Sequence, residues 1–148
     1  MQIPSTDWEL QFVLSDIERF LPIRHFLIML GGNDLLCHAS FVAENVADRM
    51  ERFVKRLTAQ FPVDSIQYWL IAPPPMVLGT WVAEDRLLME SSRLSECYRD
   101  VALRCGIRFL DSSNWNVELS FDGVHFSSAG HISFAQKLME ILSADEEE

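Results

Sequence analysis

The chain has 148 residues, of which 49% are hydrophobic. This length and composition suit one folded domain with a sizeable core, and they exclude an intrinsically disordered chain or a small disulfide-stapled protein. The formal net charge is −10, and so acidic a protein is not expected to bind by neutralising phosphates or anionic lipids. We expect a single domain over residues 1–148, no nucleic-acid partner, and a solvated acidic tail at residues 145–148.

The cysteines and histidines are spaced unlike metal or redox motifs. The three cysteines match no CxxC pattern, and the histidines outside the motifs discussed below have no second Cys/His pair nearby. No apolar run approaches the roughly 20 residues of a membrane span, and no basic, apolar leader is seen at Met1. We therefore expect no metal, no cofactor and no membrane span, and a cytoplasmic location.

The first part of the chain predicts one helix followed by one strand. From Ser5 or Thr6 to Phe20, apolar residues recur at three- and four-residue spacings, and Pro22 follows. Next comes an unbroken apolar run over residues 25–30, which stops at Gly31. Such a run is typical of a strand buried on both faces of a parallel sheet.

Helix and strand patterns then alternate to the end of the chain. Helices are predicted at about residues 41–60 and 85–104, strands at 65–71 and 107–110, and a last helix from about residue 127. A run of three prolines at 73–75 ends the second strand, because proline cannot continue the hydrogen-bonded ladder. Alternation of this kind implies parallel strands joined by right-handed crossovers, hence an α/β layered fold.

A first site-like motif, Gly31-Gly32-Asn33-Asp34, follows the first strand. Reactive groups in open α/β sheets gather beyond the carboxyl ends of the strands. Glycines let the backbone turn sharply beside a ligand, and Asn33 offers a neutral amide donor suited to an oxyanion. The alternative is a simple strand-to-helix turn in which Asp34 is the cap.

A second motif, Asp122-Gly-Val-His125, lies before the last helix. At a separation of three residues, the carboxylate can face the imidazole, fix its tautomer and leave the other ring nitrogen as a base. The alternative is an Asx-turn at Asp122 with a buried, hydrogen-bonded His125. Both motifs in one chain, each after a strand, favour the catalytic interpretation.

Together the motifs resemble the SGNH hydrolases, the GDSL-like lipases and esterases. Leu30 to Leu35 resembles their third sequence block, Asp122 to His131 their fifth, and Ile71 to Pro75 the segment between. The resemblance implies a three-layer α/β/α, flavodoxin-like fold with a parallel sheet. It also implies hydrolysis of a small-molecule ester without a cofactor, with Asn33 and Gly32 at the oxyanion and substrate, Asp122 as triad acid and His125 as general base.

The family's first block, a Gly-Asp-Ser turn that carries the nucleophile, is not found: no serine here follows Gly-Asp. We therefore expect a domain that lacks its first two strands, with the nucleophilic serine outside this sequence. One alternative is a non-catalytic SGNH-like module that binds a ligand or a partner protein. A weaker one is a small flavodoxin-like binding domain.

The absence of the first two strands leads to an expectation about the edge of the sheet. Strand 25–30 becomes a bare hydrophobic edge, and such edges are pairing sites. We expect an N-terminal segment, a second chain or another copy of this chain to cover it. Trp69 is expected in the core, whereas Trp81 and Trp115 are candidates for the wall of an acyl or leaving-group pocket.

Overall fold

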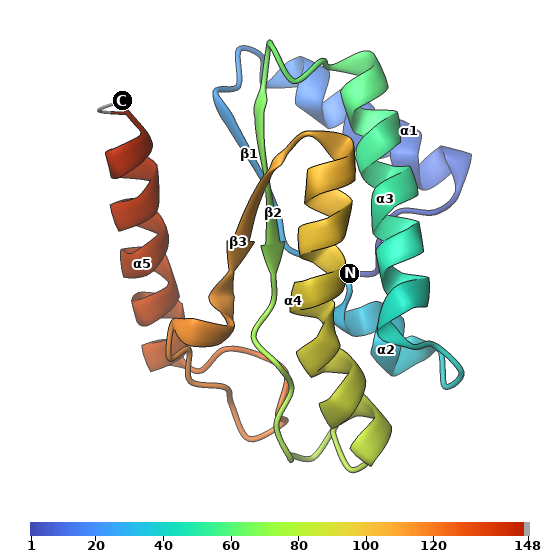
Figure 1. Cartoon of the computed structure of the whole chain (residues 1–148), viewed down its shortest axis with the longest axis vertical. Helices are drawn as coiled ribbons and strands as arrows, with labels where there is room; N and C mark the ends of the chain where they lie inside the picture. Colours follow the sequence, from blue (N-terminus) through green and yellow to red (C-terminus); the bar gives the residue numbers. More distant parts are fainter. Residues whose placement is uncertain (147–148) are drawn as a thin grey trace.

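The computed structural model describes residues 1–146, and its helices and strands alternate as the sequence predicts (Figure 1). The predicted elements differ from the observed ones by a few residues at their ends. Two short elements were not predicted, the helix α2 and the 3₁₀ turn η1. The order is α1 (Asp7–Arg19), β1 (His25–Ile28), α2 (Gly32–Cys37), α3 (Ala43–Gln60), β2 (Gln67–Ala72), α4 (Asp85–Cys105), β3 (Arg108–Asp111), η1 (Ser112–Asn114) and α5 (Ser128–Glu146).

The three strands form one parallel sheet in the order β1-β2-β3. Leu70 of β2 lies opposite Ile28 of β1 on one side and Phe109 of β3 on the other. In the described part of the chain β1 pairs only with β2, so one edge of β1 has no strand partner. Leu27 on this strand is 39% exposed. The expected bare edge is therefore present.

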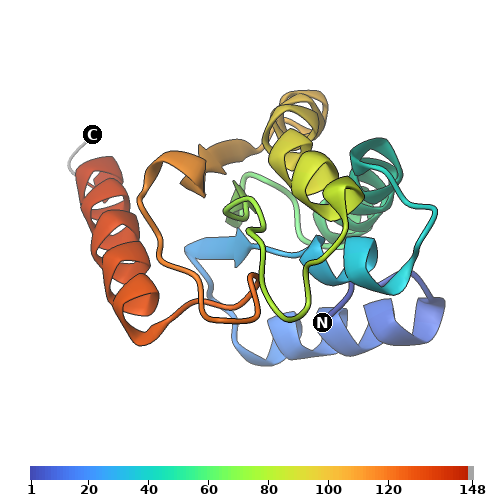
Figure 2. The same ribbon diagram turned by 90° about the horizontal axis from the view of Figure 1, so that it is seen from below.

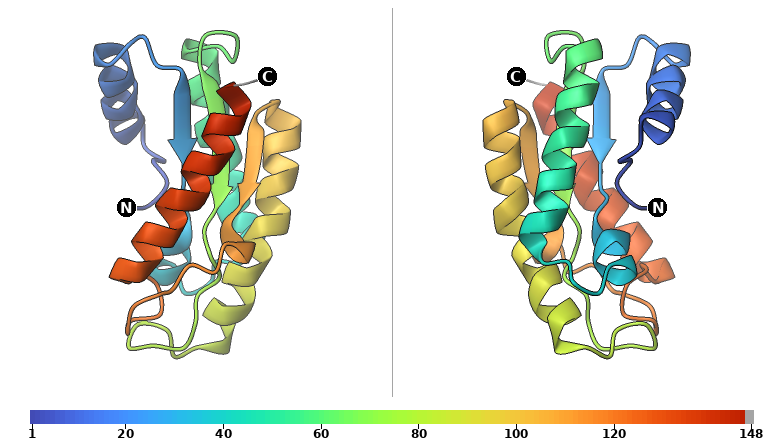
Figure 3. Two further views of the ribbon diagram at one scale, coloured as in Figure 1. Left: turned by 90° about the vertical axis from the view of Figure 1, so that its left-hand side faces the viewer. Right: turned by 90° about the vertical axis from the view of Figure 1, so that its right-hand side faces the viewer.

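Helices cover both faces of the sheet, which makes three layers. Helices α3 and α4 lie on one face and α5 lies on the other (Figures 1 and 2). Figure 3 shows α1 on the β1 side of the sheet and α4 on the β3 side. This arrangement confirms the predicted α/β class.

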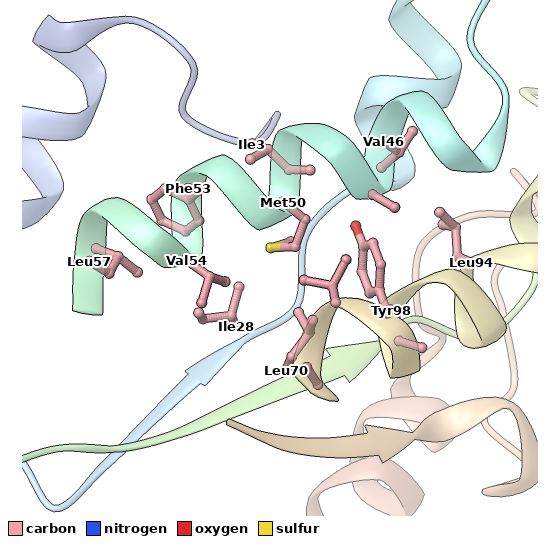
Figure 4. Packing of buried hydrophobic residues seen from close by; sticks show 14 of the residues in the cluster. Ile3, Ile28, Val46, Met50, Phe53, Val54, Leu57, Leu70, Leu94 and Tyr98 are labelled. Carbon is pink, nitrogen blue, oxygen red and sulfur yellow. The ribbon is translucent and has the colours of Figure 1, made fainter. Parts of the chain in front are cut away.

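The main core lies between the sheet and the layer of α3 and α4 (Figure 4). Met50 of α3, Leu94 and Tyr98 of α4, and Leu70 of β2 are all fully buried. The Tyr98 hydroxyl donates a hydrogen bond of 2.7 Å to the carbonyl of Leu30. Burial raises the Tyr98 pKa well above its usual value, so this hydroxyl stays a donor. Tyr98 thereby ties α4 to the end of β1, where the first motif begins.

The other face of the sheet carries an aromatic and polar row under α5. The Trp69 indole donates to His25 Nδ1 at 3.1 Å, and the Arg108 guanidinium lies 4.7 Å from the centre of the Trp69 ring. Arg108 also pairs with Asp145 at the end of α5, and Arg24 pairs with Glu146. The expectation of a solvated tail is wrong for Asp145, which belongs to α5; residues 147–148 lie outside the described residues.

None of the helices within residues 1–146 combines the length and apolar character that crossing a membrane requires. The three cysteines are free thiols. Over the same residues, no three His, Cys, Asp or Glu side chains are grouped so that they could hold a metal ion.

Candidate active site

The second motif folds into a carboxylate–imidazole pair. Asp122 Oδ2 lies 2.6 Å from His125 Nδ1. The contact places the proton on Nδ1 and leaves Nε2 as the basic nitrogen. The imidazole side chain is 57% exposed, so the alternative of a buried, structural histidine is wrong. This is the geometry of the acid and base of a hydrolytic triad.

Asp122 is held as an anion by four donors. Its Oδ1 accepts hydrogen bonds from the amides of Val124 at 2.8 Å and His125 at 2.9 Å, and from the Ser120 hydroxyl at 2.9 Å. The Val124 amide is the main reason that the pKa of Asp122 lies well below its usual range, and the His125 amide and ring and Ser120 act in the same direction. The Asx-turn of the alternative interpretation is therefore present, but it serves to fix the carboxylate.

The first motif forms the sharp turn between β1 and α2. Gly31 has φ of +117° and occupies the N-cap position of α2. A Cβ atom there would lie 2.1 Å from the Tyr98 hydroxyl oxygen and 2.9 Å from Val46. Backbone angle and space therefore both require glycine at this position. The turn places Asn33 in the first turn of α2.

A cavity of about 320 Å³ joins the two motifs. Gly32, Asn33 and His125 all line it, although the two motifs are about 90 residues apart in the sequence. The Asn33 side chain has no hydrogen-bond partner within residues 1–146, so its amide is available to a ligand. The structure thus brings together the predicted oxyanion donor and the predicted base. Other lining residues are Met1, Met29, Leu30, Gly31, Pro73, Pro74, Met76, Ser91, Leu94, Val124, Phe126 and His131.

Asp34 does not cap α2, as the alternative interpretation had proposed; Gly31 occupies the N-cap position. The Asp34 side chain is fully buried, with Oδ1 3.2 Å from Arg49 Nε and Oδ2 accepting a hydrogen bond of 2.9 Å from the Ile3 amide. Arg49 also donates to the Ile3 carbonyl at 3.3 Å. Burial is the main influence on Asp34 and raises its pKa, while the Ile3 amide and Arg49 oppose that shift. This network fastens α2, and hence Asn33, to α3 and to the N-terminal segment.

Comparison with known families shows which family the chain belongs to. Residues 4–131 match the GDSL-like lipase/acylhydrolase family. The chain belongs to this family. No curated protein matches the sequence significantly.

Solved structures share the fold of this GDSL-like chain. It is similar to the M. smegmatis aryl esterase, with a TM-score of 0.79, 18% identity, and coverage of 97% of this chain and 72% of that one. It also resembles an Agrobacterium tumefaciens protein that carries the name arylesterase (TM-score 0.77, 25% identity, coverage 92% and 68%). A carbohydrate acetylesterase from Sinorhizobium meliloti gives a TM-score of 0.77 at 18% identity, with coverage of 92% and 67%. The GDSL-like chain therefore spans about two thirds of the length of these neighbours.

The serines of this GDSL-like chain do not complete a triad in the structure. Within residues 1–146 no serine hydroxyl is hydrogen-bonded to Nε2 of His125. Ser91 lines the cavity, but its hydroxyl accepts from the Met76 amide at 2.9 Å and donates to the Leu88 carbonyl at 3.3 Å. Ser120 is bonded to Asp122. The hydroxyls of Ser91 and Ser120 therefore make structural hydrogen bonds.

The two candidate pocket tryptophans have different places. Trp81 meets the His125 ring edge to face, with centroids 5.0 Å apart and an interplanar angle of 81°. Trp115 packs on Phe134 of α5 at 5.2 Å and does not line the cavity. Trp69 is buried as expected. The structure thus brings Trp81, but not Trp115, to the site.

Sequence reasoning missed His131 as a cavity residue of this GDSL-like site, whereas Met76, expected at the pocket wall, does line the cavity. His131 packs on Phe126 at 5.3 Å. Its position six residues after His125, at the start of α5, could have placed it near the cavity. Met76 is held by Ser91 of α4, a contact between distant segments that no local pattern signals.

Gly31→Ala is expected to destabilise the fold more than Gly106→Ala. Both glycines have positive φ, +117° and +65°, but a Cβ on Gly106 would meet nothing within 4 Å. The control should therefore lose only about 1 kcal/mol for the backbone angle, whereas Gly31→Ala adds the clash with Tyr98 and should lose about 2 to 4 kcal/mol. Urea unfolding monitored by circular dichroism measures both, and equal losses would contradict the tight packing inferred at Gly31.

Proposed function

We propose that this chain carries the acid, a base and an oxyanion donor of a carboxylic-ester hydrolase that acts by serine acyl transfer. The nucleophilic serine belongs to a segment not contained in these 148 residues. The observation that carries the proposal is the cavity that joins Asn33 to the Asp122–His125 pair. Membership of the GDSL-like family and the esterase names of several structural neighbours support it.

The mechanism assigns one role to each group. The serine hydroxyl attacks the ester carbonyl while His125 Nε2 takes its proton, and the Asn33 amide donates to the oxyanion of the tetrahedral intermediate. Collapse of the intermediate breaks the bond to the alcohol, to which His125 returns the proton. Water, activated by His125, then hydrolyses the acyl-enzyme. Asp122 remains ionised throughout and stabilises the imidazolium.

The unpaired edge of β1 is where we propose that the missing part binds. A parallel strand paired with β1 would have its carboxyl end beside Gly31, at the same edge of the sheet as the cavity. A serine just after such a strand would face Asn33 and His125. An additional segment of the polypeptide, a second chain or another copy would supply this strand, and Met1 already lines the cavity.

Hydrolysis of p-nitrophenyl acetate tests the proposal. The 148-residue chain is compared with the product of a reading frame extended upstream of Met1. We expect turnover only by a form that contains the serine-bearing strand, and Asn33→Ala should lower its kcat about 100- to 1,000-fold. Equal turnover by the 148-residue chain would contradict a missing serine. Absence of turnover from every form would favour the non-catalytic binding module.

A further inference from the structure

The segment that leaves the cavity beyond β2 is locked to the turn that carries Asp122. The Val77 amide donates to the Gly123 carbonyl, and the amides of Thr80 and Trp81 donate to the carbonyls of Phe121 and Asp122, each at 3.1 Å. Figure 2, which views the molecule from below, shows the two loops side by side. A Cβ on Gly123 would lie 2.1 Å from the Val77 carbonyl oxygen. The backbones are therefore in close contact and hold each other rigidly.

This clamp fixes Trp81 against the base. The Trp81 amide binds the backbone of Asp122, and its ring contacts the imidazole that the Asp122 carboxylate orients. The indole is nevertheless 55% exposed, so a large apolar surface remains beside His125. Burial within the core does not explain such a tryptophan, because much of it stays in water.

Trp81 is one of four exposed apolar side chains on the two clamped segments. We call this group the apolar rim; it consists of Val77 (49% exposed), Leu78 (70%), Trp81 (55%) and Phe121 (82%). Single exposed apolar residues are ordinary, but four of them on two segments bonded to each other, one of which contacts His125, indicate a binding surface. The formal net charge of −10 disfavours an anionic ligand. A neutral, apolar ligand therefore suits this surface better.

We propose that Trp81 and the apolar rim bind the alcohol portion of the ester, and that the enzyme prefers aromatic or similarly apolar alcohols. This inference rests on the proposed function. Trp81 does not line the cavity that contains Asn33, but lies against His125, which does. With the carbonyl oxygen at Asn33, the acyl group occupies the cavity. The oxygen that receives a proton from His125 belongs to the alcohol, which therefore extends toward Trp81.

Binding of alcohols to the 148-residue chain tests this without turnover. Benzyl alcohol is titrated while the indole N–H signals of the tryptophans and the ring signals of His125 are followed by NMR. We expect saturable shifts of Trp81 and His125, and much smaller shifts with the polar alcohol 2-methoxyethanol. Trp8 is the internal control, because it is 76% exposed and has an aromatic neighbour, Phe12, but no catalytic histidine.

Variants distinguish specific binding of benzyl alcohol at Trp81 from its nonspecific binding to exposed aromatic rings. Trp81→Ala should weaken the effect of benzyl alcohol on His125 about 3- to 10-fold, Trp81→Phe should retain most of it, and Trp8→Ala should leave it unchanged. Retention in Trp81→Phe also shows that the local fold survives substitution. Equal shifts at Trp8 and Trp81, or an unchanged His125 titration in Trp81→Ala, would overturn the proposal. Because no hydrolysis is measured, this outcome is independent of whether the esterase proposal fails.

Discussion

Asp122→Asn is expected to leave the fold intact while reversing the tautomer of His125. The Asn side-chain oxygen can still accept from the amides of Val124 and His125, which now bind Oδ1 of Asp122. Its amide group then faces Nδ1 and donates to it, so the ring proton moves to Nε2 and the base is lost. In a form that contains the serine, kcat should fall about 10⁴-fold, as for this exchange in other triads.

The tautomer can be measured on the 148-residue chain itself. Nitrogen chemical shifts of the imidazole at neutral pH should report a proton on Nδ1 in the unmodified chain and on Nε2 in the variant. Ser120→Ala is the matched control, because it removes one donor to Asp122 but keeps the carboxylate. Its tautomer should be unchanged. The same tautomer in the Asp122→Asn variant as in the unmodified chain would contradict the assigned role of Asp122.

Among the substitutions proposed here, Arg49→Met is expected to lower the free energy of unfolding most. The change keeps an apolar stem of similar length but leaves the buried carboxylate of Asp34 without its cation, which lies 3.2 Å away. Breaking one partner of a buried ion pair costs about 3 to 5 kcal/mol. Arg19→Met is the control, because Arg19 pairs with Asp16 at the surface, where its side chain is 74% exposed. The control should change the free energy of unfolding by less than about 0.5 kcal/mol.

The loss in Arg49→Met should shrink as the solution is acidified. Burial raises the pKa of Asp34 in the folded chain, so the contribution of this group to stability is complete below its usual pKa and is lost as pH rises through the raised value. Without Arg49, the buried carboxylate keeps the Ile3 amide as a donor but has lost its cation, and protonation removes the remaining cost of its charge. Urea unfolding at pH 7 and at pH 4.5 should therefore show a larger difference from the unmodified chain at pH 7. A difference that is independent of pH would indicate lost packing alone.

Most of the fold could be predicted because its signals are local. Helix α1 begins at the predicted place, after Thr6, whose Oγ1 accepts a hydrogen bond from the Glu9 amide at 3.2 Å. The short helix α2 could not be predicted, because Gly31 at its N-cap offers no side-chain acceptor. What fixes α2 is the contact of Asp34 with Arg49, fifteen residues further along the chain.

The candidate site likewise contains one contact that the sequence predicts and one that it does not. Asp122 and His125 are three residues apart, so their pairing follows from a local turn and could be predicted. The contact of Trp81 with His125 depends on backbone bonds between two loops about 40 residues apart, and no spacing encodes it. Trp115 looked equally suitable in the sequence, but the chain turns it toward α5.

Covalent labelling shows directly whether the chain that carries the proposed acid, base and oxyanion donor also holds the nucleophile. The 148-residue chain is treated with a fluorophosphonate, and labelled peptides are mapped by mass spectrometry, with His125→Ala treated in parallel. We predict no serine labelling that depends on His125. Labelling of one serine in the unmodified chain that disappears in His125→Ala would show that the nucleophile is present and would overturn the proposal that it lies outside these 148 residues.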